Sequence, residues 1–334
     1  MELKQDFVFQ PLPAIEPDPS SVLDTTTTDL ARATALDVAP EAPSELGPLQ
    51  GLLGPWQGTG FNMIWRPFHS PDPRLMQGHF LELNLTLEQL EVEEVKGAIP
   101  NRGLLQPDIN MFGVHYLQQI QDANVIVNGS HAALHFEPGI WLNIPATTDP
   151  KEPPTVARLG SIPHGTSILA QGTAFTRPGP PQIDPVSITP FVIGHPEKLR
   201  PFPESDLSIP TAFRSPDGQL TGITQEMVDN PNSVLTAAIA GQTILETTTL
   251  IITSDPNGKI AGGGTANTAF LQGAPPNPRP NANAALVTAI FWIETVQGEN
   301  GQPDFQQLQY TQTVLLDFGG LSWPHVSVAT MRFT

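Results

Sequence analysis

The chain has 334 residues, of which 33 are acidic and 15 are basic, so its formal net charge is −18. A surface of that sign repels phosphate groups and anionic lipids, and we expect neither nucleic acid nor membranes as partners. The absence of cysteine excludes disulfides, thiolate metal ligands and cysteine nucleophiles. Only 14% of the residues are charged and 37 are proline, which suits short strands and long loops better than exposed helices.

The N-terminal residues lack a basic segment followed by an apolar one, so we expect no secretory signal. No stretch approaches the roughly 18 apolar residues that a membrane-spanning helix needs. The expected location is the cytoplasm.

Residues 1–46 are acidic and rich in proline and threonine. Such a segment is either a partly disordered arm or an extended lid around the body. Residues 47–334 are predicted to form a single β-barrel domain, interrupted at about 177–246 by a proline-rich insertion. One short helix is expected there at 233–240, with Asn232 as its N-cap and Gly241 as its stop.

Between residues 80 and 95, leucines alternate with polar residues, which is the pattern of a strand with one buried face. Eleven segments are candidate strands: 58–65, 80–95, 111–120, 133–144, 155–161, 166–175, 247–254, 262–270, 285–296, 306–317 and 322–333. Their hairpin spacing indicates antiparallel pairing. We therefore predict an all-β protein, an up-and-down, calycin-like barrel of about ten strands around a ligand cavity.

The first strand opens with Gly54, Trp56, Gly58 and Gly60 at alternate positions. Glycines at this spacing are typical of a strand that bends or that another backbone approaches closely. The indole of Trp56 either plugs the closed end of the barrel or contacts a ligand.

Two other segments carry histidines. His135 and Glu137 share one face of a strand, and a buried pair of this kind needs hydrogen bonds or a ligand. With His131 they resemble part of a non-haem metal site, but the tight His-x-His of cupins is absent. His164 lies in a Pro-His-Gly turn, where it either faces a ligand at the barrel rim or is solvated.

The last predicted strand carries His325 near its start, and the next positions on the same face are Ser327, Ala329 and Met331. The two small side chains leave room for something large and flat against the imidazole. If Val326 and Val328 point inward instead, His325 faces solvent, because a one-residue shift exchanges the two faces.

In this order, the motifs resemble those of the nitrobindin-like haem proteins, small barrels related to fatty-acid-binding proteins. Four segments carry the resemblance: Gly54, Trp56, Gly58 and Gly60; His135, Glu137 and Gly139; the turn Pro163, His164, Gly165 and Thr166, rearranged from the family's His-Pro-Thr-Gly; and His325 with Arg332. It covers residues 47–175 and 285–334, and leaves the arm and the insertion unmatched.

The resemblance implies that haem b is bound, with His325 as the axial iron ligand. It makes Trp56, His135 and Glu137 further cofactor-binding residues, and His164 with Thr166 the catalytic groups at the rim or distal side. The implied chemistry is peroxidase-like or peroxynitrite-isomerising.

A second hypothesis is a haem-free calycin that binds or transforms a small apolar ligand, since the insertion and the arm could close a deep cavity. A third is a structural or interaction module. The partner in the first two is a small molecule, and a homodimer remains open. The glycine run at 262–264 lacks the Lys-Ser/Thr of a P-loop, and no Gly-x-Ser-x-Gly indicates a serine hydrolase.

Overall fold

The computed structural model describes residues 44–72, 78–216, 221–260, 262–273 and 279–334. Residues 1–43 of the predicted arm lie outside these ranges. Residues 44–334 form one compact unit. No helix in the described ranges has the length and apolar character needed to cross a membrane.

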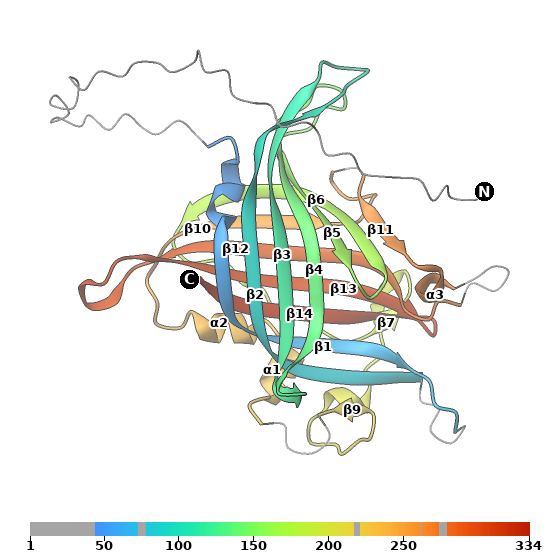
Figure 1. Cartoon of the computed structure of the whole chain (residues 1–334). Helices are drawn as coiled ribbons and strands as arrows, with labels where there is room; N and C mark the ends of the chain where they lie inside the picture. The colour runs from blue at the N-terminus through green and yellow to red at the C-terminus, as the bar shows by residue number, and fades with distance from the viewer. Residues whose placement is uncertain (1–43, 73–77, 217–220, 261, 274–278) are drawn as a thin grey trace, which may run out of the picture. The chain divides into compact units, whose positions relative to one another are not determined.

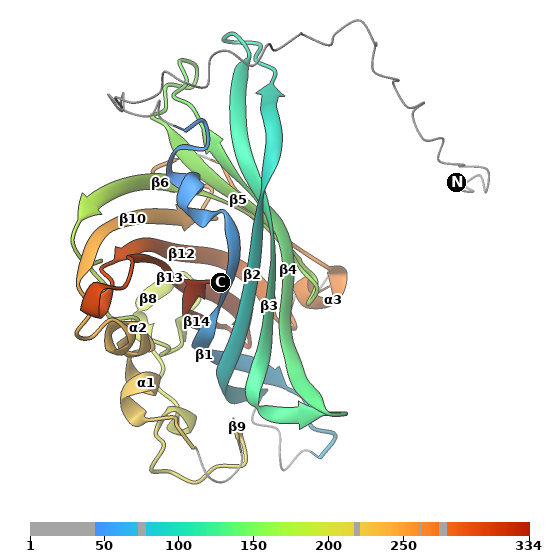
Figure 2. The same ribbon diagram turned by 60° about the vertical axis from the view of Figure 1, so that its left-hand side comes forward.

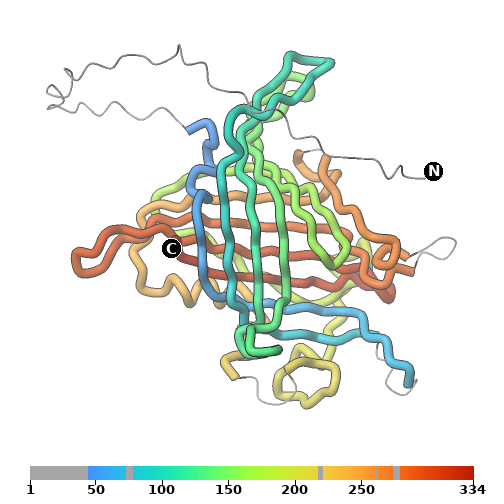
Figure 3. The backbone as a smooth tube through the Cα atoms, in the orientation of Figure 1, coloured from blue at the N-terminus to red at the C-terminus, as the bar shows by residue number. Residues whose placement is uncertain are grey.

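Within the described residues, ten antiparallel strands close into a barrel in the order in which the chain runs (Figure 1). Strand β1 pairs with β2 on one side and with β14 on the other, so the ring has no free edge. The strands are β1 (Gly54–Phe68), β2 (Gly78–Asn101), β3 (Ile109–Val127), β4 (Ser130–Ile144), β5 (Thr155–Ile162), β6 (Thr166–Pro178), β10 (Ile244–Thr253), β12 (Asn283–Val296), β13 (Phe305–Phe318) and β14 (Leu321–Phe333). The predicted all-β, up-and-down barrel is confirmed, and Figure 3 follows its successive hairpins.

The segment 262–270, predicted as a strand, does not join the ring. It contains β11 (Gly264–Asn267), which pairs with part of β6, and continues into α3 (Ala269–Gln272). Glycines at 262, 263 and 264 all have positive φ, a conformation that interrupts a regular strand.

The insertion between β6 and β10 carries small elements that pack on the outside of the barrel. They are β7 (Phe191–Val192), β8 (His195–Leu199), η4 (Pro203–Ser205), β9 (Arg214–Ser215), α1 (Gln225–Asp229) and α2 (Ser233–Ala238). Helix α2 begins where the sequence predicts, but the Asn232 side chain makes no cap hydrogen bond. Helices α1 and α3 were not expected from the sequence.

The barrel interior is apolar at the end where β1 begins. Leu49 and Leu52 of η2 (Gly47–Leu52) are buried there in one core cluster with Trp56. The indole of Trp56 donates a hydrogen bond to the Leu52 carbonyl at 2.8 Å. Trp56 therefore plugs this end, which is one of its two predicted roles.

A second core lies outside the barrel, beneath the insertion. Phe61, Met63 and Trp65 alternate along β1, point outward and have no exposed surface. The Trp65 indole donates to the Ile188 carbonyl of the insertion at 2.9 Å. Figure 2 shows α2 beside β14 and α1 below α2, and the outward-facing residues of β14 join the same cluster. Because these side chains face outward, the intervening residues of β1 face the interior.

Candidate functional site

A cavity of about 320 Å³ lies inside the barrel. Small-molecule sites range over about 300–1,000 Å³, so this one suits a compact ligand. Its walls combine aliphatic and polar side chains: Asn62, Ile64, Arg66, Pro67, Glu82, Gln118, Ile120, Leu134, His135, Ile162, His164, Thr166, Leu271, Ala282, Ala284, Val287, Tyr310, Gln312, Val314, Leu316, His325 and Ser327.

Three histidines from separate parts of the chain line this cavity. His325 lies on β14, His135 on β4 and His164 in the turn between β5 and β6. In the closed ring, β14 and β5 are on opposite walls, because equal numbers of strands separate them in each direction. The rings of His135 and His164 are 5.9 Å apart between centroids. A ligand in the cavity would lie between this pair and His325.

The hydrogen bonds of His325 determine which of its ring nitrogens can contact a ligand. Its Nε2 lies 2.9 Å from Asn62 Oδ1, and the Ser327 hydroxyl donates to the same oxygen at 2.7 Å. An amide oxygen only accepts hydrogen bonds, so Nε2 carries the proton and Nδ1 keeps its lone pair. Both hydrogen bonds of the His325 ring within the described residues use Nε2.

Burial lowers the pKa of His325 to about 3, and the neighbouring His135 and His164 add to the effect. The ring is therefore neutral at physiological pH. A group with so low a pKa is a poor general base at pH 7, because its conjugate acid holds a proton weakly. The imidazole is thus suited to accept a hydrogen bond or to bind a metal ion, but not to abstract a proton.

The buried Glu137 carboxylate, itself paired with Arg158, holds the His135 ring in place. Its Nε2 lies 3.1 Å from Glu137 Oε2, and the other Glu137 oxygen accepts from Arg158 at 2.7 Å and from Tyr116. Burial opposes ionisation of Glu137, but the Arg158 guanidinium and His135 outweigh it and lower its pKa to about 2. The predicted His135–Glu137 pair is confirmed, with an arginine that the sequence reading missed.

A polar floor separates the cavity from the apolar plug. The Tyr310 hydroxyl donates to Glu88 Oε2 at 2.7 Å, and Gln118 donates to Tyr310 at 3.1 Å. Arg158 donates to Gln312 at 2.6 Å. Burial raises the pKa values of both Glu88 and Tyr310. These groups largely satisfy one another, so the floor presents polar atoms without a free charge.

The other cavity-lining groups include an ion pair and two residues of the β5–β6 hairpin. Arg66 and Glu82 are both partly exposed and form an ion pair with each other. His164 lies at the rim with part of its surface exposed, and the partial burial of its ring, together with the neighbouring His135, lowers its pKa. The Thr166 hydroxyl donates to Asn267 of β11 at 2.8 Å, which ties β11 to the rim.

Of the residues predicted from the sequence, the structure brings His325, His135, His164 and Thr166 to one cavity. It does not bring Trp56 there, because the 15 residues of β1 place Trp56 at the plugged end. Glu137 is fully buried behind His135 and does not line the cavity. Neither Trp56 nor Glu137 therefore lines the cavity that holds the three histidines.

The sequence reading missed Asn62, Gln118 and Tyr310. The inward direction of Asn62 could have been predicted, since Asn62 follows Gly58 and Gly60 at alternate positions of β1. Its partner could not be read from the sequence, because the pairing of Asn62 with Ser327 joins opposite ends of the domain.

The described residues hold no group of three or more His, Asp or Glu side chains arranged to bind a metal ion. Comparison of the sequence with models of known families and with curated proteins finds no match.

Proposed function

We propose that this protein binds a compact, uncharged and mainly apolar ligand inside its barrel, with His325 as the direct polar contact. The observation that carries the proposal is the cavity between His325 and the His135–His164 pair. The His325 Nδ1 lone pair is directed by the Asn62 and Ser327 hydrogen bonds, and it can accept a hydrogen bond from an N–H or O–H group of the ligand.

The charges support a neutral ligand. His325 is neutral, and Arg66 is paired with Glu82. The Glu137 charge is paired with Arg158 behind the wall. A charged ligand would lose its hydration without gaining an unpaired partner, whereas apolar groups would contact Ile64, Ile120, Val314 and similar side chains.

Haem b is a second candidate, favoured by one specific feature, the neutral imidazole of His325 on the cavity wall. Other features fit haem poorly. Nε2 of His325 is engaged by Asn62, so the nitrogen left for iron is Nδ1, which lies next to the ring's attachment to the backbone and is hard for a porphyrin to reach. The volume of about 320 Å³ is also near the lower end for ligand sites.

Native mass spectrometry of the purified full chain tests the proposal, followed by titration with indole, a compact apolar probe with one N–H donor. We expect a small-molecule adduct on the wild type, and indole binding that weakens at least tenfold in His325→Phe, which removes Nδ1 and fills space. His195→Phe is the control, because His195 is exposed on β8.

An adduct with the mass of haem, lost in His325→Phe, would favour the second candidate. Absence of both an adduct and indole binding would reject ligand binding in the cavity. Equal indole affinity of His325→Phe and the wild type would reject the role of His325.

A further inference from the structure

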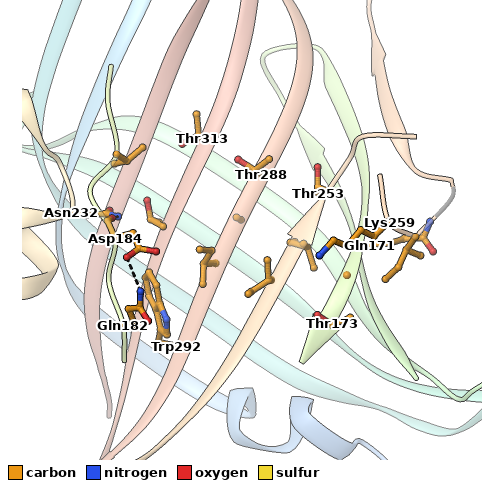
Figure 4. Close-up of a pocket in the computed structure, with 18 of the residues that line it drawn as sticks. Gln171, Thr173, Gln182, Asp184, Asn232, Thr253, Lys259, Thr288, Trp292 and Thr313 are labelled. Carbon is orange, nitrogen blue, oxygen red and sulfur yellow. Dashed lines mark hydrogen bonds between the residues drawn. The ribbon is translucent and has the colours of Figure 1, made fainter. Parts of the chain in front are cut away.

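A second hollow, larger than the interior cavity, lies on the outer wall of the barrel. It has a volume of about 540 Å³ and crosses β6, β10, β12 and β13. Figure 4 shows Gln182 and Asp184 of the insertion on one side, Gln171 and Lys259 on the other, and Thr288 and Thr313 between them. We call this hollow the outer groove.

The strand register arranges the floor of the outer groove in two rows. One row is polar and runs through Gln171, Thr253, Thr288 and Thr313. The next row has hydroxyl groups at its ends and apolar side chains at its centre: Thr173, Ile251, Ile290 and Thr311. Ile251 is 41% exposed. The floor thus offers an apolar strip with a hydroxyl group at each end and a polar row along one side.

Two buried polar atoms among the lining residues have no partner. Asn232 is 3% exposed and Thr311 is 8% exposed, yet neither Asn232 Oδ1 nor Thr311 Oγ1 has a hydrogen-bond partner. Asn232 Nδ2 donates to the Asp184 carbonyl at 2.7 Å, which fixes the amide and leaves Oδ1 as an acceptor. Buried polar atoms are usually satisfied, so these two acceptors beneath the floor of the outer groove are left for a bound molecule or an ordered water to complete.

From these observations we infer that the outer groove binds a neutral carbohydrate. A sugar ring has an apolar C–H face that matches Ile251 and Ile290, and hydroxyl groups at its edge that match threonine, asparagine and glutamine. Asp184 and Lys259 lie on opposite sides of the outer groove, so its own charges are of both signs and favour neither a cation nor an anion. The net charge of −18 further disfavours a strongly anionic ligand.

An extended peptide fits less well. Peptides that bind to sheets add a strand to a free edge and hydrogen-bond through their backbone. Strands β6, β10, β12 and β13 each have neighbours on both sides, so the outer groove offers side chains and not backbone groups.

Titration calorimetry of the full chain with maltotriose, cellotriose, mannotriose and triacetylchitotriose tests the inference. We expect at least one of these glycans to bind, and Thr311→Val to weaken that binding about three- to tenfold through loss of one hydrogen bond. Thr311→Val should leave the melting temperature unchanged or raise it, because it removes an unsatisfied buried hydroxyl. Thr288→Trp should abolish binding by filling the groove.

Thr59→Val is the matched control, because Thr59 is exposed on β1, a strand that does not line the outer groove. His325→Phe should also leave glycan binding intact, which separates this inference from the cavity proposal. Failure of all four glycans to bind would overturn the inference, as would equal affinity of Thr288→Trp and the wild type. Displacement of a bound glycan by an unrelated extended peptide would indicate a peptide site instead.

Discussion

Among single residues, several ionisable side chains are buried, and the groups around each one decide whether it is charged. Glu137 is ionised because Arg158 lies beside it, whereas burial lowers the pKa of His325 and keeps the ring neutral. Glu294 on β12 has no exposed surface; Gln307 donates to one carboxyl oxygen at 2.6 Å, and the other oxygen has no partner. Burial raises the pKa of Glu294 to about 7.

Glu294 makes stability depend on pH in a defined direction. Its folded-state pKa of about 7 lies above its ordinary value of 4.5, so its contribution is fully present below pH 4.5 and is lost as the pH rises through 7. Glu294→Gln removes this loss. We expect the variant to be more stable than the wild type by about 1–3 kcal/mol at pH 8 and nearly equal at pH 4.

Urea unfolding of the wild type and Glu294→Gln at both pH values measures this difference. Glu246→Gln is the control, since Glu246 is exposed on the neighbouring strand β10. A variant that is less stable at pH 8 would show that the Glu294 carboxylate stabilises the fold.

At the scale of elements, barrel closure depends on close contact between the first and last strands. A side chain at Gly58 would place its Cβ 2.0 Å from the Thr330 carbonyl oxygen, and one at Gly60 would lie 2.2 Å from that of Val328. The alternating glycines of β1 therefore allow β14 to approach, and this pairing also brings Asn62 to His325 and Ser327.

Replacement of Gly58 tests this role. We expect Gly58→Ala to destabilise the protein by about 1–3 kcal/mol, because the methyl group meets backbone atoms that cannot move aside without disturbing the pairing. Thermal unfolding measures the change, and Thr59→Ala, an exposed neighbour, should shift the melting temperature little. Equal stability of Gly58→Ala and the wild type would show that the two strands are not held this tightly.

At the scale of the whole molecule, the sequence predicts the barrel because local signals repeat along it. Alternating side chains and turn residues define most of the strands, and the order of these strands is the order of the ring. The inward direction of His325 is confirmed as well: it lines the cavity with Ser327, while Val326 and Val328 are buried outside.

Other features could not be read from one sequence, because they depend on contacts between distant segments. The outward apolar residues Phe61, Met63 and Trp65 are explained only by the insertion that covers them. Arg158 meets Glu137 across neighbouring strands, and no local pattern identifies it as a partner. Gly262–Gly264 looked like part of a strand, although positive φ values remove it from the ring.

The most direct test of the central claim is a long-range ¹H–¹⁵N NMR spectrum of the His325 ring, recorded from pH 8 to pH 4 and then with indole. We expect a neutral ring with the proton on Nε2 throughout this range, because the pKa of His325 is about 3. We also expect the Nδ1 chemical shift to change when indole binds. A ring that titrates near pH 6.5, or an Nδ1 chemical shift that indole leaves unchanged, would show that His325 is not a buried, neutral hydrogen-bond acceptor for the ligand.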